Sequence, residues 1–343
     1  MKAVRFVGVG QAPELVEVAK PEPAAPDDVI VRIAGAGVCR TDIHILDGQA
    51  PLQPPPPPPF TLGHETAGWV ESVGPGVHGL ARGDPVILHP GMTCGLCPAC
   101  REGNDMYCPS IRFPGVDGTD GGYAEFVRTS VRAVVPLPAG TDPAPLAPLA
   151  DAGITAYHAV RRIRQLGRPG STIVVMGVGG LGHLGIQLLK AMTAAAVVAL
   201  DLSPERLEFA RRLGADYAFD GQSDRVVSEV QKVTGGQGAD AVLDFVGEGP
   251  APDLALKLLR RGGTYSIVGY GGRLTTPTVD MIVRELQILG NFVGSYRDLT
   301  ELMELNRRGL VRVSSIRYPL AEAAKALDDL RSGRLLGRAV LVP

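Results

Sequence analysis

Short apolar runs broken by glycine and proline fill the first 150 residues of the chain. Each run has the length and the turn-residue boundaries of a β-strand. The clearest are VIVRIAGAGV (29–38), AGWVESVG (67–74), DPVILHP (84–90) and AEFVRTS (124–130). We therefore expect a β-rich, barrel-like domain whose loops carry the polar chemistry.

From residue 153 the apolar positions follow a helical period instead. In ITAYHAVRRIRQLG (154–167) apolar side chains recur every three residues from Ile154 to Ile163, and Gly167 ends the pattern. Strand-like and helix-like stretches then alternate to about residue 290. This alternation predicts a doubly wound parallel sheet with helices on both faces.

The change of period also predicts the domain organisation, since 343 residues exceed one ordinary hydrophobic core. We expect a β-rich domain over residues 1–152, a doubly wound domain over 153–290, and a segment, 291–343, that returns to the first domain. The proline tract Pro54–Pro59 predicts an extended polyproline II loop.

Charge and composition exclude several classes of partner. The 34 basic and 36 acidic residues leave a formal charge of −2, which gives no electrostatic basis for binding nucleic acid or an anionic membrane. No apolar run approaches the ~18 residues that span a bilayer. The stretch MKAVRFVGVG (1–10) predicts a strand rather than a secretory leader. We expect a cytoplasmic protein, in which cysteines more often bind metals than form disulfides.

A glycine-rich loop follows the apolar stretch STIVVM (171–176) and precedes a predicted helix. Between a strand and a helix, G-x-G-x-x-G spacing lets the backbone approach a pyrophosphate at the helix N-terminus. The loop therefore predicts a dinucleotide site formed by Gly177, Gly179, Gly180 and Gly182.

Asp201 indicates which dinucleotide would bind. It ends the apolar stretch AVVALD (196–201), nineteen positions after Gly182. A carboxylate there accepts hydrogen bonds from the adenosine ribose hydroxyls and repels a 2′-phosphate, so we expect NAD rather than NADP. Alternatively, Asp201 only ends a strand and begins a turn.

Four of the five cysteines lie within fifteen residues, in a lobe that we place at 91–110. Their C-x2-C-x2-C-x7-C spacing suits a closed tetrahedral zinc site, which would stabilise a short loop without its own core. An iron–sulfur cluster is the alternative, although ferredoxins place only three residues before the last cysteine. The predicted structural ligands are Cys94, Cys97, Cys100 and Cys108.

The fifth cysteine, Cys39, and His64 make an incomplete ligand pair, because a catalytic zinc takes three protein ligands and keeps one open position. The motifs around them carry a resemblance over essentially the whole chain. GVCRTDIH (37–44), LGHE (62–65), the cysteine lobe, GVGGLGHLG (177–185) and GRAVLVP (337–343) follow the order found in zinc-dependent medium-chain alcohol dehydrogenases.

This resemblance implies a GroES-like catalytic domain, a Rossmann NAD domain and two zinc ions per subunit, one catalytic and one structural. It further implies reversible hydride transfer between NAD and a zinc-bound alcohol or ketone. In most of the family a cysteine is the third catalytic ligand, at the position of Asp151. An aspartate there resembles bacterial members, many of which act on secondary alcohols and ketones.

The exchange of cysteine for Asp151 is chemically tolerable. Thiolate and carboxylate carry the same charge, and a carboxylate oxygen lies about 2.0–2.2 Å from zinc instead of about 2.3 Å for sulfur. We therefore expect Cys39, His64 and Asp151 to bind the catalytic zinc. The alternative is that Asp151 caps a helix beginning near Ala152, and one oxygen could serve each purpose.

The resemblance also assigns supporting roles around the metal. Thr41 and His44 match a proton relay, and Asp42 is expected to orient His64 by accepting its second N–H. Glu65 matches a carboxylate that replaces bound water transiently. For Glu65 a second interpretation stays open, a charge neutralised by an arginine.

Three arginines match cofactor-binding positions: Arg40 and Arg338 for the pyrophosphate, and Arg206 for the adenosine ribose. Each is alternatively a solvated surface charge. We expect a small alcohol or ketone substrate and a homo-oligomer, a tetramer or else a dimer. The competing functions are a primary-alcohol or polyol dehydrogenase and a catalytically silent NAD-binding protein.

Overall fold

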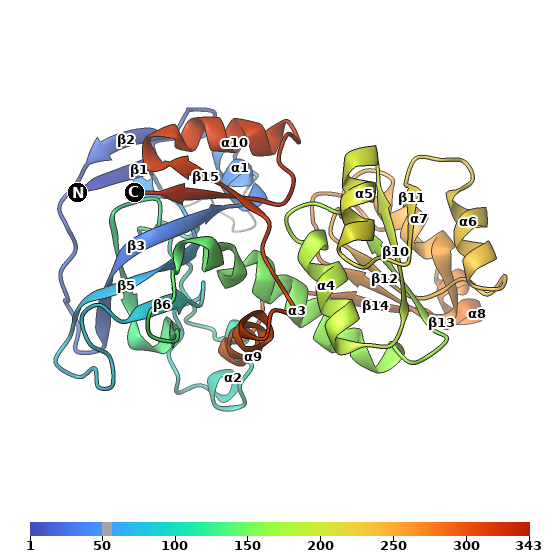
Figure 1. The fold of residues 1–343 in the computed structure, drawn as a ribbon, viewed down its shortest axis with the longest axis horizontal. Coiled ribbons are helices and arrows are strands. Elements are labelled where there is room, and N and C mark those ends of the chain that lie inside the picture. The colour runs from blue at the N-terminus through green and yellow to red at the C-terminus, as the bar shows by residue number, and fades with distance from the viewer. Residues whose placement is uncertain (50–56) are drawn as a thin grey trace. The chain divides into compact units, whose positions relative to one another are not determined.

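A computed structural model describes residues 1–49 and 57–343, which form two compact units (Figure 1). The first unit comprises Met1–Ile154, Gly294–Glu301 and Val313–Pro343, and the second comprises Thr155–Val293 and Leu302–Arg312. The segment 291–343, predicted to return to the first domain, is divided between the units, because Leu302–Arg312 groups with the second. Helix α9 (Tyr296–Arg307) therefore begins in one unit and ends in the other.

The first unit is built on two sheets of mainly antiparallel strands, as the short apolar runs predict. The larger sheet has the order β15-β16-β3-β5-β6-β8, with β7 also paired to β3, and the smaller has the order β2-β1-β4. The strands are β1 (Lys2–Phe6), β2 (Glu14–Glu17), β3 (Asp28–Val38), β4 (Phe60–Thr61), β5 (Glu65–Val73), β6 (Pro85–Leu88), β7 (Phe126–Ser130), β8 (Val134–Pro136), β15 (Ser315–Pro319) and β16 (Arg338–Val342).

Short helices connect these strands and carry much of the polar chemistry. They are α1 (Arg40–Leu46), α2 (Pro98–Arg101), α10 (Ala323–Arg331) and the 3-10 turns η1 (Asp105–Tyr107), η2 (Val131–Ala133), η3 (Ala144–Ala150) and η5 (Leu320–Glu322). The last strand, β16, pairs antiparallel with the end of β3, where Ala339 lies opposite Val38. The C-terminal strand therefore lies beside the strand that leads to Cys39.

The second unit confirms the predicted doubly wound fold. Its sheet is entirely parallel, and the order β11-β10-β9-β12-β13-β14 is that of a dinucleotide-binding domain. The strands are β9 (Thr172–Met176), β10 (Ala196–Asp201), β11 (Tyr217–Asp220), β12 (Ala239–Asp244), β13 (Leu259–Ile267) and β14 (Gln287–Gly290).

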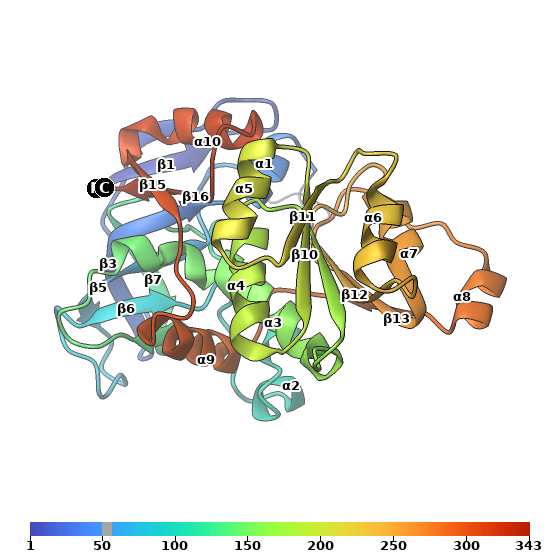
Figure 2. The ribbon, with the colours of Figure 1, turned by 45° about the vertical axis from the view of Figure 1, so that its right-hand side comes forward.

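Helices cover both faces of this sheet. In Figure 2, α4 and α5 lie on one side of the strands, and α6 and α7 lie on the other. The helices are α3 (Ala152–Ile163), η4 (Arg164–Leu166), α4 (Gly182–Met192), α5 (Pro204–Arg212), α6 (Val226–Val233), α7 (Ala251–Leu258) and α8 (Thr278–Arg284).

The proline tract and the absence of a membrane-spanning run were also predicted from the sequence. Of the proline tract, Pro54–Pro56 lie outside the described residues, and the Pro58–Pro59 peptide bond is cis. Within the described part of the chain, every helix is too short or too polar to cross a bilayer.

Candidate functional site

Four side chains from distant parts of the sequence meet in the first unit: Cys39, His64, Glu65 and Asp151. Their ligand atoms all lie within 4.8 Å of one another. Cys39 follows β3 and His64 precedes β5. These strands pair antiparallel with Gly37 opposite Glu65, which brings the cysteine and the histidine together. Asp151 comes from the junction of η3 and α3.

The distances within this cluster fit a tetrahedral metal site. His64 Nε2 lies 3.4 Å from Asp151 Oδ2, and Cys39 Sγ lies 3.9 Å from the same oxygen. Donor atoms bound to one zinc ion lie about 3.3–3.8 Å apart in a tetrahedron. Both ring nitrogens of His64 are buried, and neither has a hydrogen bond of good geometry among the described residues. A zinc ion would supply the missing partner of Nε2.

The electrostatics favour a cation at this point. Burial alone would lower the pKa of His64, but the carboxylates of Asp42 and Asp151 raise it well above its ordinary value. Burial alone would raise the pKa of Asp151, yet contact with His64 lowers it, so this side chain is a carboxylate at neutral pH. The surroundings therefore stabilise positive charge, which a divalent ion supplies.

The helix-cap alternative for Asp151 does not match the contacts. Among the described residues, no backbone N–H of the first turn of α3 donates to the Asp151 side chain. The N–H of Ala152 donates instead to Glu65 Oε1, at 3.1 Å. The Oδ2 atom of Asp151 instead contacts Cys39 and His64.

Glu65 and Arg338 form a buried ion pair, with the guanidinium donating to Glu65 Oε2. Glu65 is fully buried and Arg338 is 3% exposed. Burial raises the pKa of Glu65 to about 7, although the charge of Arg338 counteracts this shift. A side chain on Gly37 would overlap the Glu65 carboxylate, which explains the glycine in GVCRTDIH. The arginine-paired interpretation of Glu65 therefore matches the structure, and Arg338 is a buried partner of Glu65 rather than a solvated charge.

Asp42, which was predicted to orient His64, lies beside its ring. The side chain is fully buried, and its Oδ1 faces His64 Nδ1 at 3.4 Å. Its Oδ2 accepts hydrogen bonds from the Cys39 N–H (2.9 Å) and the Tyr123 hydroxyl (2.6 Å). Sequence reasoning missed Tyr123, because no local motif links it to Asp42.

The other residues predicted from the GVCRTDIH motif share helix α1, which begins directly after Cys39. Thr41 is half-buried, His44 is buried and Arg40 is exposed.

The four cysteines of the lobe also converge, with their sulfur atoms within 4.8 Å of one another. All are free thiols. The N–H groups of Leu96 and Cys97 donate to Cys94 Sγ, and the N–H of Cys94 donates to Cys108 Sγ. The two bonds to Cys94 lower its pKa to about 6, because they stabilise the thiolate. Burial and the neighbouring Cys97, by contrast, raise the pKa of Cys100 to about 11. It is therefore the convergence of four sulfur atoms that suits a metal site here.

In the second unit, the glycine loop between β9 and α4 has the shape of a phosphate cradle. Gly177 has φ +84°, which favours glycine, and a side chain on Gly182 would overlap the Gly177 carbonyl oxygen. Gly179, by contrast, has open space where a side chain would stand. The first and third glycines are therefore required by the fold, and the second leaves room for a ligand.

Asp201 ends β10 and braces this loop. Its Oδ2 accepts from the Val178 N–H at 2.7 Å, while its Oδ1 accepts from the N–H groups of Leu202 and Ser203. The turn-forming interpretation of Asp201 is thus correct, but it does not exclude ribose binding, since a carboxylate has about four acceptor positions. Arg206 Nη1 lies 4.0 Å from Asp201 Oδ1.

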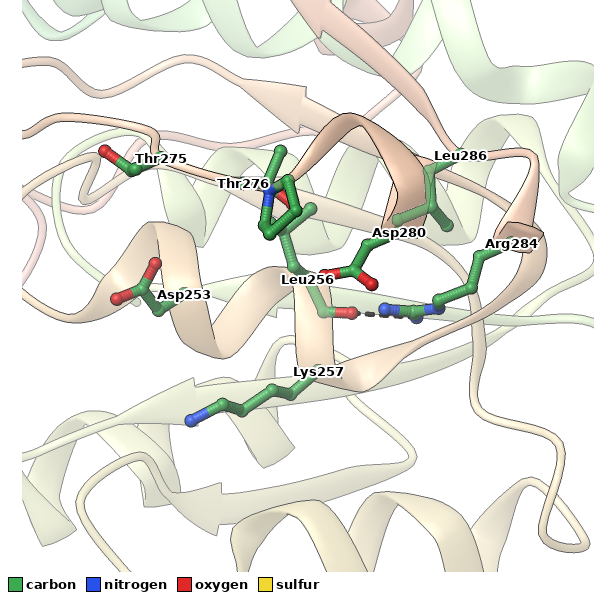
Figure 3. A pocket seen from close by; sticks show the side chains of 9 residues that line it. Asp253, Leu256, Lys257, Thr275, Thr276, Asp280, Arg284 and Leu286 are labelled. Carbon is green, nitrogen blue, oxygen red and sulfur yellow. Dashed lines mark hydrogen bonds between the residues drawn. The ribbon is translucent and has the colours of Figure 1, made fainter. Parts of the chain in front are cut away.

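A separate pocket of about 250 Å³ lies between α7 and α8 (Figure 3). Its lining includes Asp253, Lys257 and Asp280, with Arg284 at one side. Arg284 donates to the carbonyl oxygens of Leu256 and Leu259 at the end of α7. The guanidinium thus caps a helix, and the pocket contains no residue of the predicted sites.

Comparison with known proteins gives consistent results over the whole chain. Residues 25–139 match the alcohol dehydrogenase GroES-like domain, and residues 180–308 match the zinc-binding dehydrogenase domain. An NAD-dependent alcohol dehydrogenase of Sulfurisphaera tokodaii is 35% identical, with both chains fully covered.

Solved structures agree with this similarity. The alcohol dehydrogenase of Aeropyrum pernix has 46% sequence identity and a TM-score of 0.96, with both chains fully covered. An acetophenone reductase from Geotrichum candidum in complex with NAD has 31% identity and a TM-score of 0.88, covering 100% of this chain and 97% of its own.

Proposed function

We propose that this chain, which belongs to the zinc-dependent medium-chain alcohol dehydrogenase family, acts on secondary alcohols and ketones. The chain is an NAD-dependent oxidoreductase of small-molecule alcohols. One observation carries the assignment of its centre: the ligand atoms of Cys39, His64 and Asp151 lie together in one cluster, in which Cys39 and His64 are buried and Asp151 is partly exposed. The similarity to an acetophenone reductase supports a secondary-alcohol substrate.

We assign the catalytic metal to Cys39, His64 and Asp151. A zinc ion bound there would act as a Lewis acid that lowers the pKa of an alcohol hydroxyl. The thiolate and the carboxylate together balance a divalent charge, and Asp42 holds His64 with Nε2 directed to the cluster. Glu65 is close enough to serve as the alternate carboxylate, with Arg338 holding it in place.

We assign the cofactor to the glycine loop and the end of β10. NAD bound there would accept a hydride from the alcohol carbon. The loop formed by Gly177, Gly179, Gly180 and Gly182, together with the N-terminus of α4, suits its pyrophosphate. Within this loop Gly177 shapes the turn, because its own N–H donates to the Leu200 carbonyl at 2.8 Å. Asp201 and Arg206 would hold the adenosine ribose.

We further propose that Thr41 and His44 carry the alcohol proton outward along α1. Thr41 and His44 are three positions apart on the same short helix, so their side chains lie on neighbouring positions of one face, which supports a shared role in proton transfer. Arg40, exposed at the start of this helix, would contact the cofactor pyrophosphate.

The lobe and the surface suggest the wider organisation. We assign the structural zinc to the four lobe cysteines, which need the reduced thiols of a cytoplasmic protein. We propose a homo-oligomer, a tetramer or a dimer. The edge strand β14 of the second unit and the exposed apolar side chains of α8, among them Ile282 at 77% exposure, support this assembly.

NADH formation with a matched panel of alcohols tests the proposed substrate. With 2-butanol, 1-butanol and sorbitol, we expect kcat/KM to be at least about tenfold higher for the secondary monoalcohol, the range that one pocket contact can discriminate. A preference for sorbitol or 1-butanol would favour a polyol or primary-alcohol dehydrogenase. No turnover of any alcohol by protein holding two zinc ions would favour a silent NAD-binding protein.

A further inference from the structure

Tyr123 lies against the chain segment that carries the His64 ligand. The N–H of Tyr123 donates to the Leu62 carbonyl at 2.8 Å, and that of Gly122 donates to the Gly63 carbonyl at 2.7 Å. The tyrosine ring covers Gly63, which has φ +97° and where any side chain would overlap ring carbon Cδ1. The glycine before His64 is therefore required by both its backbone conformation and this ring.

The hydroxyl of Tyr123 reaches the same ligand by a second route. It donates to Asp42 Oδ2 at 2.6 Å, and both side chains are fully buried. The same oxygen accepts the N–H of Cys39, and the other carboxylate oxygen, Oδ1, faces His64 Nδ1. One buried carboxylate thus contacts the backbone of one proposed metal ligand and the ring of another.

We propose that the Tyr123 hydroxyl is a positioning group for the catalytic metal, acting through Asp42. This inference rests on the proposed ligand set. Two donors on Oδ2 fix the plane of the carboxylate, so Oδ1 stays directed at His64 Nδ1. The partner of Nδ1 sets the tautomer and the orientation of a metal-binding imidazole.

Chemistry and burial keep this hydroxyl in the donor role. Burial and the neighbouring charge of Asp42 raise the pKa of Tyr123 well above its ordinary value, so the phenol stays protonated. Without it, Oδ2 would keep only the Cys39 N–H as donor, and the carboxylate could turn about that single bond. The Cys39 and His64 donors would then hold the metal less rigidly.

Tyr123→Phe removes the hydroxyl and keeps the ring that covers Gly63. Tyr265→Phe is the matched control, because Tyr265 is also fully buried and donates to a buried carboxylate, Asp244 Oδ2, at 2.7 Å in the second unit. Zinc release from the full-length holoenzyme to a chelator is followed with a colorimetric indicator, and the two zinc ions of each chain are resolved by their rates.

We expect the catalytic zinc of Tyr123→Phe to leave about tenfold faster than in the wild type, the low end for loss of a group behind a metal ligand. The lobe zinc should leave at the wild-type rate, and Tyr265→Phe should change neither rate. Cobalt placed in the catalytic site should show a shifted visible spectrum only in Tyr123→Phe. The proposal would be overturned if Tyr123→Phe released its catalytic zinc at the wild-type rate, or if it released both zinc ions faster by the same factor.

The route through Asp42 is tested by a double-mutant cycle with Asp42→Asn. If the hydroxyl acts through this carboxylate, adding Tyr123→Phe to Asp42→Asn should change zinc release by less than about twofold. Multiplicative effects of the two substitutions would contradict the route. The zinc content of the wild-type protein distinguishes failure of this proposal from failure of the proposed function. A wild-type chain that holds only the lobe zinc would refute the ligand set itself.

Discussion

At the scale of single residues, the metal cluster is defined by what each donor atom offers a divalent ion. When zinc is bound, Cys39 would offer a thiolate, Asp151 a carboxylate and His64 a neutral imidazole, and the three together would carry the charge that one zinc ion neutralises. The oxygen donor is harder than the sulfur it replaces in most of the family. In the proposed site, Asp151 would therefore leave the metal at least as strong a Lewis acid.

Asp151→Ala should remove about one of the two zinc ions of each chain together with the dehydrogenase activity, because two remaining ligands hold zinc weakly. Asp151→Cys is the control, since it restores a donor of the same charge, and it should keep both ions. Zinc content by atomic spectroscopy and NADH formation measure the outcome. Unchanged turnover in Asp151→Ala would refute ligation by this residue.

Asp201 braces the glycine loop and is assigned a second function, holding the adenosine ribose, and substitution can separate the two. Asp201→Gly removes both the charge and the acceptor for the Val178 N–H, so the affinity for NAD should fall about tenfold. Asp201→Asn keeps an acceptor and removes the charge that repels a 2′-phosphate, so it should mainly relax discrimination against NADP. Dissociation constants for both cofactors provide the comparison. An unaltered NAD preference in both variants would remove the cofactor assignment.

At the scale of elements, the His64 segment is held by neighbours from elsewhere in the chain. The loop 112–119 packs on it, since a side chain on Gly115 would overlap the Gly63 carbonyl. Asp117 organises this loop by accepting from Arg112 Nε (2.7 Å) and from the backbone N–H groups of Phe113 and Thr119. The loop therefore braces the metal site without contributing a ligand.

The charge of Asp117 gives this brace a defined pH dependence. Burial alone would raise the pKa of Asp117, but Arg112, Thr119 and the backbone N–H groups lower it below its usual value of 3.8. Its contribution to stability is thus present above pH 3.8 and is lost as the pH falls through the lowered folded-state value.

Asp117→Asn should consequently lower the free energy of unfolding by about 1.5 kcal/mol at neutral pH, the low end for hydrogen bonds to a charged group. The difference from the wild type should shrink as the pH falls below about 4, because the wild-type carboxyl then becomes neutral as well. Urea unfolding of both proteins across this range measures the difference. A difference independent of pH would show that Asp117 acts by shape alone.

At the scale of the whole molecule, sequence patterns predicted what depends on local order. The alternation of strand-like and helix-like stretches after residue 153 predicted the parallel sheet. The sequence also placed Asp201 at the end of the strand that follows the glycine loop, which is β10. The spacing of the lobe cysteines predicted their convergence. Each of these features is contained in a short, continuous stretch of chain.

What the sequence did not reveal depends on long-range strand pairing. Arg338 reaches Glu65 because β16 pairs with β3, and Tyr123 reaches Asp42 because its segment pairs with residues 61–63. Neither contact is marked by a local sequence motif, because the two residues of each pair are far apart along the chain. The helical pattern of Leu302–Arg312 likewise predicts a helix but not the unit with which that helix packs.

Anomalous X-ray scattering at the zinc edge, from crystals of the full chain grown with zinc and NAD, tests the central claim most directly. We predict two peaks per chain. One should be surrounded by the four lobe cysteines, and the other should lie about 2.0–2.3 Å from Cys39 Sγ, His64 Nε2 and an oxygen of Asp151. A peak in the lobe alone, or a second zinc ion without Asp151 among its ligands, would contradict the account.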